Sequence, residues 1–288
     1  MKTAIVTDSN SGIFQDEAKE LGIFVVPMPM LIDDKEAYEG IDIHLDEFLI
    51  AQESGKQITT SQPAPANVMD LWDKILEDYD ELVYLPMSSA LSGSCNTAKM
   101  LSEDYDGKVV VVDNHRISVT LKVSALQALE LSKEGKSALE IKEILEKDSY
   151  NASIYIAVDT LEYLKRGGRI TPAAAAIGSV LNLKPILSIL GGKLDAFAKV
   201  RGMNKAKKIM IETAANDLMT RFSEYSADEL YIATAGSFRT KETADEWAKM
   251  VHEAFPEYEM MSDQLPLSII THTGPDAMGI GVYPKKAK

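Results

Sequence analysis

Cysteine is almost absent from this chain of 288 residues, since Cys95 is the single one. One cysteine excludes an internal disulfide, and we expect it to act as a small buried apolar residue. Histidine is also scarce, and no His or Cys pair has the spacing of a zinc site, so we expect no metal. The four histidines lie far apart in the sequence, at His44, His115, His252 and His272.

Long apolar segments are missing as well. The most apolar stretch, residues 21–32, is too short to span a bilayer, and Pro27 and Pro29 interrupt it. Residues 1–7 pass directly into a strand-like pattern, without the apolar core and cleavage site of a signal peptide. We therefore expect a cytoplasmic protein.

Glycine-rich nucleotide motifs are not found either: the chain has no Gly-x4-Gly-Lys-Ser/Thr and no Gly-x-Gly-x-x-Gly. We expect no cofactor. The net charge of −14 argues against nucleic-acid binding. Positive charge is concentrated in residues 165–208, which hold ten Lys or Arg and one acid, Asp195. This basic strip is either a docking surface for an anionic partner or a solvated helix face.

Short apolar runs alternate with amphipathic segments in the first half of the chain. Such alternation predicts an α/β fold with a mainly parallel sheet and helices on both faces. In the second half, two facing apolar runs around Gly191-Gly192 predict a hairpin, and the mixture with long helices indicates an α+β mixed sheet. We expect two domains, residues 1–152 and 153–288. The predicted strands are residues 2–7, 23–26, 82–87, 108–112, 154–158, 181–190, 193–200, 230–233, 268–271 and 278–283, and the predicted helices are 15–21, 46–54, 68–79, 98–101, 118–133, 138–147, 160–166, 172–176, 204–222 and 240–255.

A Ser-rich turn follows the predicted strand at 82–87 and precedes a helix. Four hydroxyl side chains and Gly93 occur between Ser88 and Ser94. The first N–H groups of a helix lack intrahelical partners and attract anions, and Ser92 or Ser94 can add a hydroxyl donor. The alternative is that Ser92 only caps its helix. Asp8, Thr60, Ser92 and Asp113 each follow an apolar run or lie in a turn, so they can converge on one rim of the sheet.

Two glycine-bearing loops in the second half also suit a carboxylate or a phosphate. Residues 165–171 combine Gly167-Gly168 with Arg166 and Arg169, and residues 271–275 place His272 at the end of a predicted strand. The alternatives are a helix C-cap for the glycines and a hydrogen-bonded structural role for His272.

Two other function classes remain open from the residues alone. A Ser92/His272 or Cys95/His272 pair would make a Ser- or Cys-dependent acyl hydrolase, because such sites are defined by geometry and not by chain order. A sensor of a phosphorylated metabolite would use the basic strip.

Seven short motifs follow one another along the chain: Thr7-Asp8-Ser9, Thr60-Ser61-Gln62-Pro63, Ser88-Ser89 with Leu91-Ser92-Gly93, Asp113, Asp159 to Ile170, Lys184-Pro185-Ile186-Leu187 and His272-Thr273-Gly274-Pro275. The block Leu-Lys-Arg-Gly-Gly-Arg is the most specific of them. In this order the motifs resemble the DegV family of bacterial fatty-acid-binding proteins from end to end.

The resemblance implies a carrier without its own catalysis. It implies a long-chain fatty acid, or its acyl phosphate, in an apolar tunnel between two domains. Met28, Met30 and residues 173–177 are candidate walls because methionine adapts to varied shapes, and the alternative for each is an ordinary core position. A separate fatty acid kinase would phosphorylate the acid for phospholipid synthesis, and transient membrane contact is compatible with this. The carboxylate would be held by Thr60 and Ser92. Further candidate ligand residues are Ser61, Gly93, Ser94, Arg169 and His272, and Arg166 and Arg201 would face the partner.

The chain departs from the usual family pattern at two places. Ser94-Cys95-Asn96 stands where Thr-Tyr-Gln is usual, and Asn114 stands where Ser is usual. The Thr60 and Ser92 hydroxyls are retained. The two departures leave open which acyl length is preferred and how the site is hydrogen-bonded in detail.

Overall fold

The computed structural model describes residues 1–176 and 183–287. The chain divides into two compact units. Of the described residues, unit 1 contains 1–150 together with the short segment 266–268 and residue 287, and unit 2 contains the described part of 151–265 and residues 269–286. The sequence predicted one boundary, at 152, whereas two short C-terminal segments belong with unit 1.

Unit 1 is built on a parallel four-stranded sheet with the order β2-β1-β6-β7. Its strands are short apolar runs, as predicted, because both faces of the sheet are buried. β6 is buried at every position. The strands are β1 (Thr3–Asp8), β2 (Phe24–Val26), β6 (Glu81–Leu85) and β7 (Val109–Val111).

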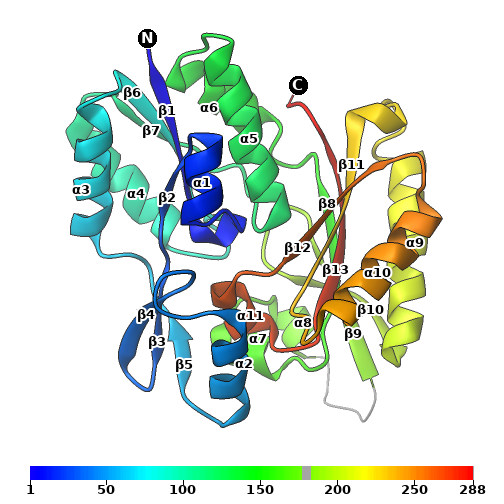
Figure 1. The fold of residues 1–288 in the computed structure, drawn as a ribbon. Helices are drawn as coiled ribbons and strands as arrows, with labels where there is room; N and C mark the ends of the chain where they lie inside the picture. Colours follow the sequence, from blue (N-terminus) through cyan, green and yellow to red (C-terminus); the bar gives the residue numbers. More distant parts are fainter. Residues whose placement is uncertain (177–182, 288) are drawn as a thin grey trace. The chain divides into compact units, whose positions relative to one another are not determined.

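Helices cover both faces of this sheet, which confirms the predicted architecture (Figure 1). One face packs Ile5 and Val83 against α1, α5 and α6, and the other packs Val6 and Tyr84 against α3 and α4. The segments are η1 (Ser9–Ser11), α1 (Gln15–Leu21), α3 (Pro65–Leu76), α4 (Ser94–Ser102), η2 (Glu103–Tyr105), α5 (Val119–Lys133) and α6 (Ala138–Lys147).

A small antiparallel sheet of unit 1, with the order β4-β3-β5, was not predicted. Thr60, which the sequence placed after an apolar run or in a turn, is the last residue of β5 and lies opposite Met30. Asp33 and Asp34 both adopt positive φ in the β3–β4 turn, a conformation that short polar side chains tolerate. The elements are β3 (Pro29–Ile32), β4 (Lys35–Tyr38), α2 (Leu45–Glu53) and β5 (Ile58–Thr60).

Unit 2 has a mixed six-stranded sheet with the order β10-β9-β8-β13-β11-β12, which confirms the predicted α+β character. β11 and β12 pair in parallel, and the other neighbours are antiparallel. The predicted hairpin is β9 and β10, although residues 181 and 182 lie outside the described residues. The strands are β8 (Ser153–Ala157), β9 (Leu183–Ile189), β10 (Asp195–Arg201), β11 (Leu230–Gly236), β12 (Glu259–Gln264) and β13 (Met278–Pro284).

Two long helices, α9 and α10, share the core of unit 2, where Met210 and Trp247 pack on the sheet. Two shorter helices, α7 and α11, carry the candidate site residues Arg166 and His272. The proposed wall residue Ile177 follows α8 and lies outside the described residues. The helices are α7 (Glu162–Gly167), α8 (Pro172–Ala175), α9 (Met203–Met219), η3 (Ala227–Glu229), α10 (Lys241–Ala254) and α11 (Leu267–Thr273), of which the first two residues, Leu267 and Ser268, belong to unit 1.

The prediction of a strand at 268–271 is wrong, because these residues belong to α11. Their β-branched and apolar character favours a strand, yet tertiary contacts decide otherwise. The N–H of Leu267 donates to Glu39 Oε2 at 2.7 Å, and the Thr273 hydroxyl donates back to the Ile269 carbonyl. His272 therefore lies in the last turn of a helix. Within the described residues, no helix is both long enough and apolar enough to cross a membrane.

Candidate functional site

The backbone of the Ser-rich turn, residues 86–93, is held from several sides within unit 1. The anion site is predicted for the first N–H groups of α4, which follow this turn. Most amides of the turn itself donate to acceptors of the protein, so the donors that the turn offers to a ligand are mainly its side-chain hydroxyls. The bonds run from Met87 N to Asp8 Oδ2 (2.8 Å), Ser88 N to the Arg116 carbonyl (3.0 Å), Ser89 N to Asp113 Oδ1 (3.2 Å), Ala90 N to Ser88 Oγ (3.2 Å), and Leu91 N and Ser92 N to the Ser88 carbonyl (3.0 and 3.1 Å).

Ser92 and Ser94 form a hydroxyl pair at the start of α4. Their Oγ atoms are 2.9 Å apart, and Ser92 Oγ also accepts the N–H of Ser94 at 3.2 Å. Gly93 is the N-cap, so Ser92 binds the first amide of the helix from one residue further out. When Ser94 donates the hydroxyl bond, Ser92 accepts two hydrogen bonds and its own O–H is left for a ligand. Such chains strengthen the terminal donor.

The Thr-Ser-Gln-Pro turn lies against the start of α4. Gln62 Oε1 accepts the Thr97 hydroxyl at 2.9 Å, and it lies 3.8 Å from the place where a Cβ on Gly93 would be. Gln62 follows Thr60 by two residues, and Gly93 directly follows Ser92. The structure thus brings the two motifs that carry the predicted hydroxyls side by side. Thr60 and Ser92 are half-buried, Ser94 is buried, and Ser61 is exposed.

A small pocket beside this turn has mainly apolar walls. Its walls include Val68, Tyr84 and Leu101, and Gln62, Ser94 and Thr97 are also among its lining residues. The Tyr84 hydroxyl is buried and has no hydrogen-bond partner among the described residues.

Cys95 is fully buried in the core of unit 1, as predicted. Burial, with the negative charge of Asp113 nearby, raises the pKa of its thiol to about 12. The thiol is therefore protonated at neutral pH, whereas a cysteine nucleophile must be a thiolate. This observation argues against the cysteine form of the acyl hydrolase.

Asp8 and Asp113 meet the Ser-rich turn from the ends of two strands, as the sequence had suggested. Asp8 is fully buried, and burial raises its pKa to about 6 despite hydrogen bonds from Met87 and Asn10. Burial alone would raise the pKa of Asp113, but hydrogen bonds from Ser89 and Lys99 bring it below the usual value.

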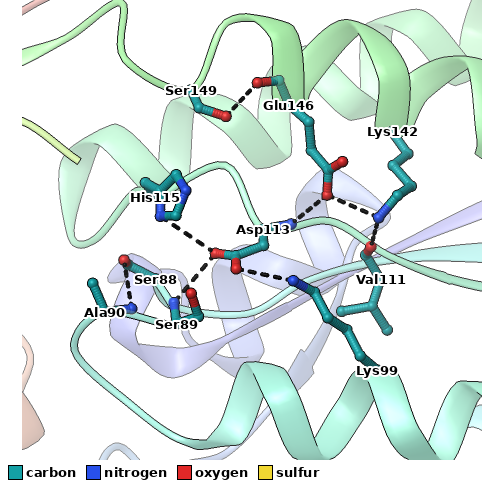
Figure 2. Close-up of polar contacts among 10 residues, drawn as sticks. All are labelled: Ser88, Ser89, Ala90, Lys99, Val111, Asp113, His115, Lys142, Glu146 and Ser149. Atoms are coloured by element: carbon teal, nitrogen blue, oxygen red, sulfur yellow. Dashed lines mark hydrogen bonds and ion pairs between the residues drawn. The ribbon is translucent and has the colours of Figure 1, made fainter. Parts of the chain in front are cut away.

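Figure 2 shows Asp113 at the centre of a charged cluster of unit 1. Lys99 Nζ donates to its Oδ2 at 3.0 Å, and His115 Nδ1 lies 3.7 Å from its Oδ1. The Asp113 amide donates to Glu146 Oε1, which also accepts from Lys142. Among the described residues, no three His, Cys, Asp or Glu are placed to hold a metal ion.

In unit 2 the two predicted glycine loops meet. A Cβ on Gly167 would lie 2.1 Å from His272 Nδ1, and one on Gly274 would lie 2.4 Å from the Tyr163 ring. The two loops can make contact only because Gly167 and Gly274 have no side chains. Gly168 has positive φ and is the C-cap of α7, as the alternative interpretation predicted.

His272 is neutral at physiological pH. Burial, followed by the positive charges of Arg169 and Arg166, lowers its pKa to about 4. Arg169 donates to the Gly167 carbonyl, and Arg166 lies over the Tyr163 ring at 5.1 Å. Three predicted residues therefore come together in unit 2: a neutral imidazole beside two guanidinium groups.

The remaining cations of the basic strip are spread over several elements of unit 2. Lys184 pairs with Asp159, and Lys193 donates to the Gly168 carbonyl. Arg201 is exposed at the end of β10. Lys205, Lys207 and Lys208 lie on α9, and Lys165 and Arg166 lie on α7, so the strip is not a single helix face.

Glu39 is a half-buried residue whose carboxyl sequence reasoning missed. Burial raises its pKa to about 8, although the Leu267 N–H donates to it. No local signal marks it, since Glu39 is one acid among many in residues 33–47 and its partner is 228 positions away.

Comparison with known proteins gives one consistent family. The family model described as "Uncharacterised protein, DegV family" matches residues 2–285. A DegV domain-containing protein of Deinococcus radiodurans is 31% identical over 290 residues, covering 100% of both chains.

Solved structures agree. A fatty-acid-binding DegV family protein from Thermus thermophilus has a TM-score of 0.87 and 29% identity, covering 99% of this chain and 100% of its own. DegV of Bacillus subtilis, described as a fatty acid binding protein, gives 0.86 and 27% over 99% of both chains. A stearic-acid-binding protein of Eubacterium ventriosum gives 0.85 and 25% over 98% of both.

Proposed function

Since the chain belongs to the DegV family, we propose that it is a carrier that binds one long-chain fatty acid. The observation that carries the proposal is the hydroxyl pair of Ser92 and Ser94 beside the Thr-Ser-Gln-Pro turn. In this proposal the Ser92 and Thr60 hydroxyls donate to the ligand carboxylate, and Ser94 orients Ser92. Ser61 and Gly93, which follow Thr60 and Ser92 in the sequence, line the proposed carboxylate site.

Uncharged donors are well matched to this task. A buried lysine or arginine would add its own desolvation penalty, whereas hydroxyls hold a carboxylate by hydrogen bonds alone. The acyl chain supplies most of the affinity. Burying about 14 methylenes at about 0.8 kcal/mol each contributes roughly 11 kcal/mol before ordering costs, enough for micromolar to nanomolar binding. The apolar tunnel implied by the family resemblance is part of this proposal.

The finer role follows the family resemblance. The carrier presents the acid to a separate fatty acid kinase, which makes the acyl phosphate for phospholipid synthesis in the cytoplasm, and the carrier does no chemistry itself. Arg169 and His272 contribute to the carboxylate site, while Arg166 and Arg201 face the kinase. A neutral His272 suits this role because it accepts or donates a hydrogen bond without adding charge.

Displacement of a fluorescent fatty acid by oleate tests the proposal. Ser92→Ala and Thr60→Ala each remove one hydrogen bond to a charged group, so we expect oleate affinity to fall about 10- to 100-fold. Ser102→Ala is the matched control, because it removes a hydroxyl at the other end of α4. Unchanged affinity in both site variants would remove the assignment.

Two readouts test the other function classes. Ester hydrolysis that needs Ser92 and no partner would identify a hydrolase. Thermal stabilisation by phosphosugars or nucleotides, but not by fatty acids, would identify a metabolite sensor.

A further inference from the structure

The Ser-rich turn is held at three successive amides by two segments of unit 1, residue 8 and residues 113–116. Asp8 holds Met87, the Arg116 carbonyl holds Ser88, and Asp113 holds Ser89. The two carboxylates come from the ends of β1 and β7, the strands on either side of β6. The turn that follows the central strand is therefore fixed from both neighbouring strands.

Asp113 also connects the turn to the helix that follows it. Its Oδ1 accepts the Ser89 N–H, and its Oδ2 accepts Lys99 Nζ at 3.0 Å from α4 (Figure 2). Ser92 lies between these two attachment points in the sequence. One carboxylate thus fixes the position of the turn relative to the helix that carries Ser94.

The segment that supplies Asp113 and the Arg116 carbonyl is itself held in an uncommon conformation. His115 and Ser118 have φ of 57° and 54°, which residues other than glycine rarely adopt. The buried Arg116 side chain donates to the Asp148 carbonyl at 2.8 Å and keeps the segment in place. Strain held by such surroundings is typical of positions where geometry serves function.

Holding the Met87 amide with the Asp8 carboxylate carries a free-energy penalty. A fully buried carboxylate loses its hydration, whereas a neutral carbonyl would accept the Met87 N–H without that penalty. The ionised form has an advantage in accepting two N–H groups at once, from Asn10 at 3.0 Å and Met87 at 2.8 Å. The ionisable groups that face it are the Tyr84 hydroxyl and the Cys95 thiol, both neutral because burial raises their pKa.

We propose that Asp8 and Asp113 are positioning residues, which together fix the Ser-rich turn and so aim the Ser92 hydroxyl at the ligand carboxylate. The part about the ligand rests on the proposed function. The part about the turn stands on the geometry of unit 1.

The variants Asp8→Asn and Asp113→Asn test this, because asparagine keeps the volume but replaces the carboxylate by a weaker, neutral acceptor. We expect oleate affinity at pH 8 to fall at least about tenfold in each. Asp217→Asn is the matched control: Asp217 is a buried carboxylate of unit 2 that accepts the Tyr155 hydroxyl, and its loss should change affinity less than about twofold. If Asp113→Asn does not fold, Lys99→Met replaces it, with a loss of about threefold expected.

The pH dependence of amide chemical shifts gives a readout that a general loss of rigidity does not change. In the ligand-free wild type, the Met87 amide should titrate with a midpoint near pH 6, and Asp8→Asn should abolish that titration. The Ser89 amide should titrate only at lower pH, because the pKa of Asp113 is lowered.

The outcomes separate the two proposals. Wild-type affinity in both Asp variants overturns the positioning role, and so does a Met87 amide resonance that is the same in the wild type and in Asp8→Asn at pH 8. A wild-type chain that takes up no fatty acid overturns the proposed function, whereas the comparison of the Met87 resonance still upholds or overturns the hold on the turn by itself.

Discussion

Replacing Glu39 by glutamine should stabilise the protein at alkaline pH. Burial raises the pKa of the Glu39 carboxyl from 4.5 to about 8, so the folded state keeps a proton that the unfolded state releases. Stability therefore falls as pH rises from 4.5 to 8. At about 1.4 kcal/mol per pH unit, the loss reaches roughly 5 kcal/mol at pH 8 and above.

Glu39→Gln removes this pH dependence but keeps an oxygen that accepts the Leu267 N–H. We expect the variant to match the wild type within about 1 kcal/mol at pH 4.5 and to exceed it by several kcal/mol at pH 9, with about 5 kcal/mol as the ceiling. Contributions of other groups, such as Asp8, cancel in the comparison.

Urea unfolding followed by tryptophan fluorescence measures the free energy of unfolding of unit 1, which contains Glu39. Trp72 is fully buried in unit 1 and Trp247 in unit 2, so a Trp247→Phe background leaves a reporter of unit 1 alone. The reasoning is refuted if the Glu39→Gln variant keeps the wild-type loss of stability between pH 4.5 and 9, or is the less stable of the two at pH 9.

Three further predictions follow from single contacts. Cys95 should react with iodoacetamide at pH 8 only on unfolding, because its thiol is buried with a pKa of about 12, and fast labelling of folded protein would contradict this. Gly167→Ala should lower stability by about 1–3 kcal/mol, because its Cβ would overlap the His272 ring, and adding His272→Ala should recover most of the loss in urea titrations. Ser137→Ala should cost about 1 kcal/mol in thermal unfolding, because Ser137 and Glu140 form the capping box of α6, and an unchanged midpoint would show that the cap contributes nothing.

The parallel sheet of unit 1 was predictable because its information is local. Runs such as Leu82 to Leu85 are apolar at every position, and turn residues follow each of them. The β9–β10 hairpin was also predictable, since Gly191-Gly192 marks its turn. β12, with the sequence Glu-Met-Met-Ser-Asp-Gln, has no such pattern, because an edge strand buries little and tolerates polar residues.

The candidate site also has a part that the sequence predicts and a part that it does not. The hydroxyls of Thr60, Ser92 and Ser94 were evident from residue type and position. That the neighbouring amides are already bound was not predictable, because their acceptors include Asp8, 79 residues from Met87, and the carbonyl of Arg116. Such partners are defined by tertiary packing, as is the Glu39 contact with α11.

The central claim is that this chain carries a fatty acid, and mass spectrometry of a lipid extract tests it most directly. Protein purified without detergent and then denatured should release long-chain fatty acid at close to one molecule per chain. A clean extract, together with no uptake of added oleate or stearate by the native protein, would contradict the account.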